Sequence, residues 1–118
     1  EYATLNVVSM DNLPIRQSRK LLVQVGTIVR PTGWEEKDAT FEGDDKQPVQ
    51  GKEIVARGTT PFQITNLDAT VEVNNSLLKT ATLLDANGMA AGTVPVTRAG
   101  GAFTVKLPPN AMYVMLQD

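Results

Sequence analysis

Residues 78–116 read LKTATLLDANGMAAGTVPVTRAGGAFTVKLPPNAMYVML, and this stretch decides the fold class. Apolar and polar side chains alternate over 103–107, which is the two-residue period of a β-strand with one buried face. Asn87-Gly88 and Gly100-Gly101 provide the positive φ angles that tight hairpin turns require. The stretch therefore predicts successive antiparallel strands joined by short turns.

The alternation continues outside this stretch. Strong strand patterns cover 3–7, 21–29, 62–64, 71–73, 103–107 and 112–116, and weaker ones cover 52–57, 79–85 and 89–97. No segment keeps a helical period over about ten residues, and only 13–19 is compatible with a single helical turn. We therefore expect one domain, residues 1–118, with eight to nine short strands in an all-β antiparallel β-sandwich or a distorted barrel.

The composition excludes several classes of function. The 118 residues include neither Cys nor His, which excludes disulfides, thiolate metal sites, imidazole catalysis and a Ser–His–Asp triad. The net charge is −2, and no basic stripe with interleaved aromatic residues marks a nucleic-acid interface. No run approaches the ~18 apolar residues of a membrane span. We expect a binding or structural protein rather than an enzyme, with neither nucleic acid nor a membrane as partner.

Residues 31–51, PTGWEEKDATFEGDDKQPVQG, show no strand pattern and predict one long acidic loop. Six carboxylates lie in this segment against two lysines. Because calcium is bound by several closely spaced oxygens, Glu42, Asp44 and Asp45 are candidate calcium ligands, and calcium is the one cofactor that the sequence suggests. The alternative is a solvated charge run without a metal, since the ligand spacing of an EF-hand is absent.

Three aromatic residues are candidates for stacking on a sugar. Trp34 is the only Trp and lies in the acidic segment after a glycine, where its flat indole face suits the C–H face of a sugar ring. Tyr2 and Tyr113 lie, by alternation, opposite the apolar faces of the first and last strands. The alternatives are a Trp34 folded over one end of the core and tyrosines that are partly buried with their hydroxyl groups in water.

Polar side chains on the expected strands complete the candidate carbohydrate-binding set. These residues are Asn6, Gln24, Arg30 and Gln63. Side-chain amides both donate and accept hydrogen bonds, and a guanidinium group donates them, so this combination suits the hydroxyl groups of a sugar.

Three segments carry a resemblance to a known class of domain. They are 78–116, with its glycine turns and final tyrosine-containing strand, 17–34 (QSRKLLVQVGTIVRPTGW) and 58–73 (GTTPFQITNLDATVEV). Together they resemble the ancillary β-sandwich domains of bacterial glycoside hydrolases. The resemblance implies a non-catalytic carbohydrate-binding module for β-linked plant polysaccharide of the β-glucan or cellulose type. It also implies a secreted, extracellular bacterial protein whose partners are a polysaccharide or oligosaccharide and the catalytic domain of a parent hydrolase.

Two other classes of function are open at this point. A ligand-free structural β-sandwich that packs on a catalytic domain would carry a large apolar patch bounded by polar residues. An adhesion-type subunit would carry an unpaired edge strand and would self-associate. An exposed row of aromatic and polar side chains would instead favour carbohydrate binding.

Overall fold

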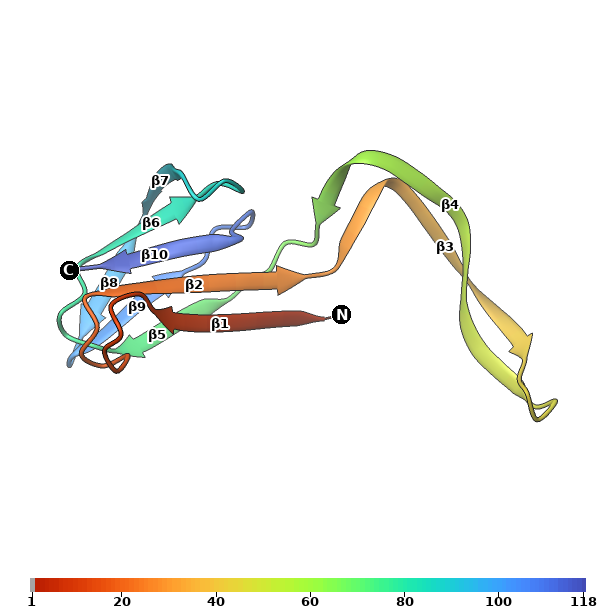
Figure 1. Ribbon diagram of the computed structural model, residues 1–118, viewed down its shortest axis with the longest axis horizontal. Coiled ribbons are helices and arrows are strands. Elements are labelled where there is room, and N and C mark those ends of the chain that lie inside the picture. Colours follow the sequence, from red (N-terminus) through yellow and green to blue (C-terminus); the bar gives the residue numbers. More distant parts are fainter. Residues whose placement is uncertain (1) are drawn as a thin grey trace. The chain divides into compact units, whose positions relative to one another are not determined.

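In the computed structural model, which describes residues 2–118, the regular elements are β-strands and all strand pairs are antiparallel (Figure 1). The expected all-β antiparallel class is confirmed, with ten strands rather than eight or nine. The described part of the chain contains no helix that is long and apolar enough to cross a membrane. The strands are β1 (Ala3–Ser9), β2 (Lys20–Thr27), β3 (Val29–Glu42), β4 (Pro48–Ile64), β5 (Thr70–Asn74), β6 (Thr80–Leu84), β7 (Ala90–Val94), β8 (Val96–Ala99), β9 (Ala102–Lys106) and β10 (Tyr113–Gln117).

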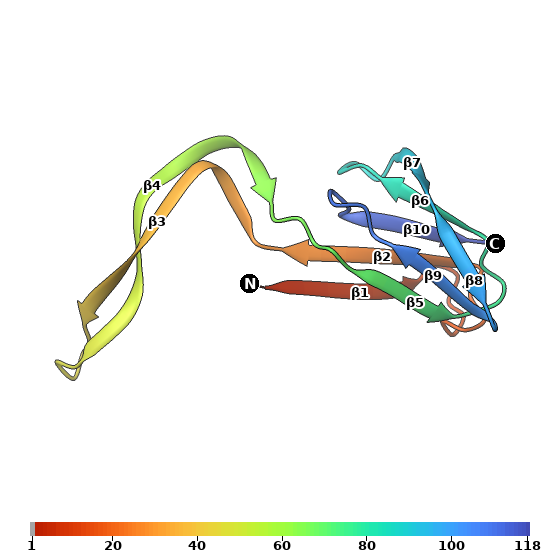
Figure 2. The same cartoon turned by 180° about the vertical axis from the view of Figure 1, so that it is seen from behind.

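The strands belong to two compact units. The first unit contains the residues up to Ile28 together with Thr65–Asp118, and we call it the sandwich unit. The second contains Val29–Ile64, and we call it the hairpin unit. The sandwich unit holds a five-stranded sheet in the order β1-β2-β10-β6-β7 and a three-stranded sheet in the order β5-β9-β8 (Figures 1 and 2). The C-terminal strand β10 therefore lies between β2 and β6, which are far from it in sequence.

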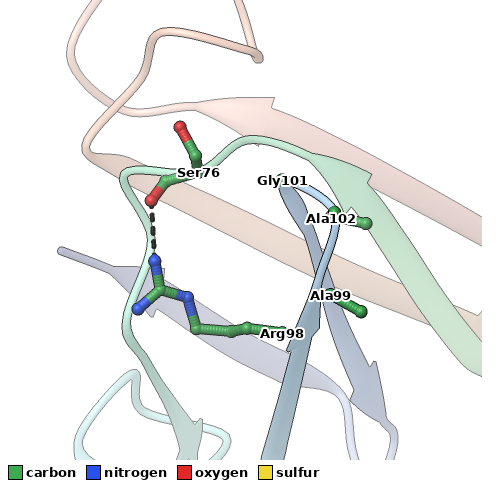
Figure 3. Close-up of a pocket in the computed structure, with 6 residues that line it drawn as sticks. Ser76, Arg98, Ala99, Gly101 and Ala102 are labelled. Atoms are coloured by element: carbon green, nitrogen blue, oxygen red, sulfur yellow. Dashed lines mark hydrogen bonds between the residues drawn. The ribbon is translucent and has the colours of Figure 1, made fainter.

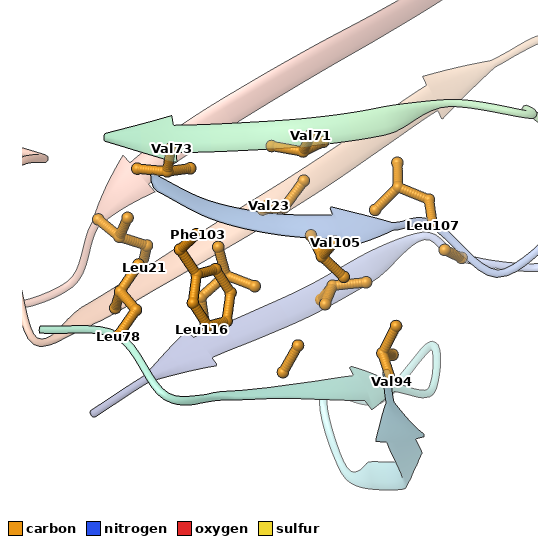
Figure 4. Packing of buried hydrophobic residues seen from close by; sticks show 13 residues of the cluster. Leu21, Val23, Val71, Val73, Leu78, Val94, Phe103, Val105, Leu107 and Leu116 are labelled. Atoms are coloured by element: carbon orange, nitrogen blue, oxygen red, sulfur yellow. The ribbon is translucent and has the colours of Figure 1, made fainter. Parts of the chain in front are cut away.

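The core of the sandwich unit lies between these two sheets (Figure 4). Alternate residues of each strand point inward, as the period of two predicts: Leu21 and Val23 on β2, and Val114 and Leu116 on β10, are all 0% exposed. Phe103 on β9 fills the space from the opposite sheet and is also 0% exposed. Each such side chain stabilises the fold by roughly 1.5–3 kcal/mol relative to an exposed position.

A carboxylate organises the loop between β1 and β2. Asp11 accepts hydrogen bonds from the hydroxyl groups of Ser18 (2.7 Å) and Ser9 (2.8 Å) and from the backbone N–H of Arg19 (2.7 Å). The backbone N–H of Leu13 adds a fourth bond at 3.3 Å. These donors stabilise the charged form, with Ser18 the largest contributor, and hold the pKa of Asp11 well below its usual range.

This arrangement predicts a pH dependence of stability. The folded-state pKa of Asp11 is lowered, so its contribution is complete above the ordinary Asp pKa of ~3.9 and is lost progressively as the pH falls below that value. We expect Asp11→Asn to lower the melting temperature at pH 7 and the difference from the wild type to shrink as the pH falls from 5 to 2. Thermal unfolding of both proteins across this range is the measurement, and a constant difference would contradict the prediction.

The same loop is tied to the rest of the sandwich unit by a buried amide. Asn75 is 2% exposed, and its Nδ2 donates to the carbonyl oxygens of Ile15 (2.6 Å) and Ser18 (2.7 Å). Pro14–Ser18 form one hydrogen-bonded turn, with the Ser18 N–H donating to the Pro14 carbonyl at 2.9 Å. The single turn expected over 13–19 is thus present, and it does not extend into a helix.

The expected acidic loop over 31–51 was wrong, because most of this segment belongs to strands. β3 and β4 form one long hairpin, and only Gly43–Gln47 make the turn. A two-stranded hairpin buries neither face, so its sequence does not need the alternation of apolar and polar residues that marks a half-buried strand. None of the residues of the hairpin unit is buried. The weaker strand pattern over 52–57 is correct and lies inside β4.

Charged and polar pairs across the hairpin explain why an acidic segment forms strands. Residues that face each other across an antiparallel pair stabilise it when their charges are opposite. The cross-strand contacts are Lys37 Nζ–Glu53 Oε2 (3.0 Å), Lys52 Nζ–Asp38 Oδ1 (2.6 Å) and Thr40 Oγ1–Gln50 Oε1 (3.1 Å). Charges that follow no clear period along the sequence therefore form opposite-charge pairs across the two strands.

Two glycines allow the hairpin to bend. Gly33 (φ 79°) and Gly58 (φ 66°) face each other across the two strands, beside the register shift between Pro31 and Thr32. A Cβ atom at Gly58 would collide with the Thr32 carbonyl oxygen and lie 2.8 Å from the Trp34 backbone nitrogen. Only glycine fits this position. The ribbon of β3 and β4 is bent rather than straight (Figure 1).

Candidate functional site

The strand register brings three of the candidate binding residues into one row. Asn6 on β1 pairs with Gln24 on β2, and Gln24 pairs with Tyr113 on β10. Val23 and Val114, which precede and follow these positions, point into the core, so Gln24 and Tyr113 point away from it. Neighbouring strands lie about 4.8 Å apart, so the row crosses about 10 Å of the outer face of the five-stranded sheet. Gln24 and Tyr113 are half-buried, and Asn6 is exposed.

An apolar strip lies beside this row on the same face. Val8, Leu22 and Met115 pair with one another across β1, β2 and β10, two residues along each strand from the row. Leu22 and Met115 are half-buried, and Val8 is 43% exposed. We call the row Asn6–Gln24–Tyr113 and this strip together the outer-sheet site. The site offers amides and a phenol next to a flat apolar surface.

The register of the outer-sheet site could not be read from local sequence. Val8, Leu22 and Met115 were not among the candidate residues, because an isolated apolar residue on the polar side of a strand gives no signal of its own. The grouping of these residues becomes visible only when the pairing of the strands is known. Gln24 and Tyr113 are 89 positions apart in the chain and face each other because β10 pairs with β2.

A second group of candidate residues lies on the hairpin unit. Arg30 pairs with Gln63 across β3 and β4, and the Arg30 guanidinium carbon lies 5.0 Å from the centre of the Trp34 ring. The indole N–H of Trp34 donates a 3.0 Å hydrogen bond to Glu36 Oε2. A cation over the face and a partner for the N–H hold the ring in one orientation. Trp34 is half-buried and lies on a strand, not in a loop over the core.

This placement makes a prediction about Trp34. We expect Trp34→Ala to leave the unfolding free energy of the sandwich unit unchanged within ~0.5 kcal/mol, since the residue lies in the hairpin unit and outside the core. Urea unfolding of the variant is the measurement. A loss of ~3–5 kcal/mol, the cost of removing a core aromatic, would show that Trp34 is structural instead.

Tyr2 lies apart from both groups. It precedes β1, is 64% exposed, and lines an open pocket of about 220 Å³ with Ala3, Thr27, Ile28 and 65–67. Within this lining, the Thr27 hydroxyl group donates a hydrogen bond to the Thr65 carbonyl oxygen at 2.6 Å. Tyr2 therefore does not join the row formed by Gln24 and Tyr113.

The candidate calcium ligands lie at the turn of the hairpin. Glu42 ends β3, and Asp44 and Asp45 lie in the turn, where Asp45 Oδ1 accepts a 3.1 Å hydrogen bond from the Gln47 backbone N–H. Over residues 2–118, no group of three or more acidic side chains is arranged to hold a metal ion. If these acids form a solvated turn without a metal, the melting temperature of the protein should be the same with calcium and with a chelator. A higher melting temperature with calcium would instead support a metal site.

A small pocket at one end of the sandwich unit has a different lining (Figure 3). It has a volume of about 200 Å³ and is lined by Ser76, Arg98 and the turn 99–102. The guanidinium group of Arg98 donates a 2.9 Å hydrogen bond to the Ser76 carbonyl oxygen. Arg98 thereby ties β8 to the loop before β6, and none of the candidate binding residues lines this pocket.

Comparison of the chain with models of protein families, with curated proteins and with solved structures finds no match. The arrangement of the residues themselves is therefore the basis for a functional proposal.

Proposed function

We propose that this chain is a non-catalytic carbohydrate-binding module whose ligand lies on the outer-sheet site. The observation that carries the proposal is the single row Asn6–Gln24–Tyr113, which the register of three neighbouring strands brings together. The sequence singled out each of these residues separately, as an amide or an aromatic group suited to a sugar. Their placement on one face of the sheet supports the proposal that all three contact the same ligand.

The chemistry of the outer-sheet site suits an extended sugar chain. The Tyr113 ring provides an apolar face against which the C–H face of a sugar ring can stack, and its hydroxyl group provides a polar rim. The amides of Asn6 and Gln24 donate to and accept from sugar hydroxyl groups. A modest affinity of ~10–100 µM requires only about −5.5 to −7 kcal/mol, which a few such contacts supply. The open face of a sheet accommodates a β-linked chain without requiring a chain end.

The proposal contains no catalytic step. The row offers amides and a phenol, which bind and orient hydroxyl groups, and it lacks the pair of carboxyl groups that glycosidic hydrolysis uses. In this account the module directs the catalytic domain of a parent glycoside hydrolase to β-linked plant polysaccharide, in a secreted bacterial protein. The support for the parent enzyme is the resemblance carried by residues 17–34, 58–73 and 78–116.

Exposed apolar side chains favour a second candidate function, that of a structural module that packs on another protein. On the hairpin unit these residues are Val29, Phe41, Val49, Ile54, Val55 and Phe62, each at least 46% exposed. They belong to the hairpin unit, whereas the outer-sheet site belongs to the sandwich unit.

Affinity electrophoresis against soluble β-glucans, xylan and mannan tests the proposed function. We expect the wild-type chain to be retarded by at least one β-linked glycan, and Met89→Ala to be retarded equally. Met89 is a matched control because it is 66% exposed in the sandwich unit, at the turn between β6 and β7, outside the outer-sheet site. Absence of retardation on every glycan would overturn glycan binding and leave the two other classes, a structural module and an adhesion-type subunit.

A further inference from the structure

The outer face of the five-stranded sheet continues beyond the outer-sheet site into a third row of polar side chains. Gln117 on β10 pairs with Lys20 on β2 and with Thr80 on β6. The next residue of β2, Leu21, and the preceding residue of β10, Leu116, are buried, so Lys20 and Gln117 point outward, onto the face that carries the outer-sheet site. Lys20 and Thr80 are exposed, and Gln117 is half-buried. We call Lys20–Gln117–Thr80 the lysine row.

The lysine row lies within reach of a polymer that occupies the outer-sheet site. Along β2, Lys20 is two residues from Leu22 in the apolar strip and four residues from Gln24. A strand rises about 3.3 Å per residue, so Lys20 lies about 13 Å from the row that contains Gln24 and Tyr113. The apolar strip fills the interval. A chain of a few sugar units that runs along the strands can therefore stack on Tyr113, cross the strip and reach Lys20.

Lys20 is also the only charged residue in the five strands of this sheet. The strand sequences are ATLNVVS, KLLVQVGT, TATLL, AAGTV and YVMLQ, and they contain neither Asp nor Glu. The chain as a whole has 13 acidic residues and a net charge of −2, so a sheet without carboxylates differs from the rest of the molecule. An anionic polymer that lies along these strands meets a cation and is not repelled by the sheet.

The acidic residues that flank the sheet are bound by the protein itself. Asp118, which follows β10, accepts a 2.7 Å hydrogen bond from the guanidinium group of Arg19. Asp11 accepts the four hydrogen bonds described above, and Asp85 Oδ1 accepts two backbone N–H groups of its own turn at 2.8 and 2.9 Å. Within residues 2–118, no carboxylate lies at ion-pair distance from Lys20. Its ammonium group is therefore available to a carboxylate of a ligand.

The backbone of Lys20 is fixed independently of this ammonium group. Its N–H donates to Ser18 Oγ at 3.2 Å, and its carbonyl oxygen accepts from the Met10 N–H at 2.8 Å. Ser18 is 0% exposed. Because these bonds do not involve the Lys20 side chain, a substitution that changes its charge should leave the fold intact.

We propose that the polysaccharide bound by this module is acidic, with a carboxylate of the sugar chain paired to the Lys20 ammonium group while another sugar of the same chain stacks on Tyr113. The inference rests on the proposed function, because it concerns the ligand of the outer-sheet site. The Gln117 amide and the Thr80 hydroxyl group beside Lys20 supply further hydrogen bonds to the acidic sugar. A β-linked chain that carries uronic acid groups has this chemistry, whereas a neutral β-glucan leaves Lys20 without a partner.

Two forms of one polysaccharide test this inference. Glucuronoxylan carries uronic acid groups, and chemical reduction of its carboxyl groups gives the same β-linked backbone without charge. Affinity for each form is measured by isothermal titration at low salt. We expect the wild type to bind the acidic form about three- to five-fold more tightly, as is usual for an exposed ion pair, and to lose this preference at about 1 M salt. Lys20→Gln should bind both forms equally, and Lys20→Arg should retain the preference.

Lys106→Gln is the matched control. It removes the same charge from β9 in the three-stranded sheet of the sandwich unit, so it changes the net charge equally and should keep the preference. Equal binding of the two forms by the wild type, or a preference that survives in Lys20→Gln, would overturn the acidic ligand and leave the proposed function standing. Failure to bind either form would also overturn the acidic ligand, and retardation by a neutral glycan in electrophoresis would then show that the proposed function holds without it.

Discussion

Replacing Tyr113 by alanine is expected to reduce glycan affinity at least ~10-fold while the protein stays folded. Tyr113 lies at the end of the row with Gln24, and it provides the only aromatic ring of the outer-sheet site. Its side chain points away from the core, so its removal leaves Val114 and Leu116 packed as before. The measurement is isothermal titration with a β-linked oligosaccharide, and Met89→Ala is the control.

An unchanged affinity in Tyr113→Ala, together with an intact fold, would remove the outer-sheet site from the account. A loss of binding that accompanies unfolding would show that Tyr113 stabilises the sheet. Gln24→Ala separates the two cases, because it deletes a hydrogen-bonding group from the same row without removing an aromatic ring.

Replacing Phe103 by alanine is expected to lower the free energy of unfolding by ~3–5 kcal/mol. Phe103 is 0% exposed and is the only aromatic side chain in the buried cluster described for residues 2–118 (Figure 4). This loss is a large part of the ~5–15 kcal/mol that stabilises a typical domain. Urea unfolding is the measurement.

Phe62→Ala is the matched control for this prediction. Phe62 is 64% exposed on the hairpin unit, so its loss should change the free energy of unfolding by less than ~1 kcal/mol. Equal losses for both variants would contradict the view that the core of the protein lies in the sandwich unit alone.

The sandwich unit was predictable because its strands are half-buried. Val71, Val73, Phe103 and Val105 alternate with polar residues and are buried in the structure, as the period of two requires. The hairpin was not predictable by the same rule, because neither of its faces is buried. Its stability rests on pairs such as Lys37–Glu53, which are 16 positions apart and appear in the sequence only as an unordered charge run.

The candidate residues were predictable one by one, and their grouping was not. The alternation around Met112 and Val114 places Tyr113 on the outer side of its strand from sequence alone. Its partner Gln24 depends on the C-terminal strand lying between β2 and β6, which is set by packing across the whole sandwich unit. The same limit applies to Trp34, whose contacts with Arg30 and Glu36 follow from a strand where the sequence indicated a loop.

Mapping a bound oligosaccharide by NMR tests the central claim most directly. The ¹⁵N-labelled chain would be titrated with a soluble β-linked gluco-oligosaccharide, and the amide and side-chain signals that move would be assigned. The account predicts that the largest shifts fall on Asn6, Gln24 and Tyr113 and on the neighbouring Leu22 and Met115. Shifts confined to surfaces outside the outer-sheet site, on either unit, or no shifts at millimolar oligosaccharide, would contradict it.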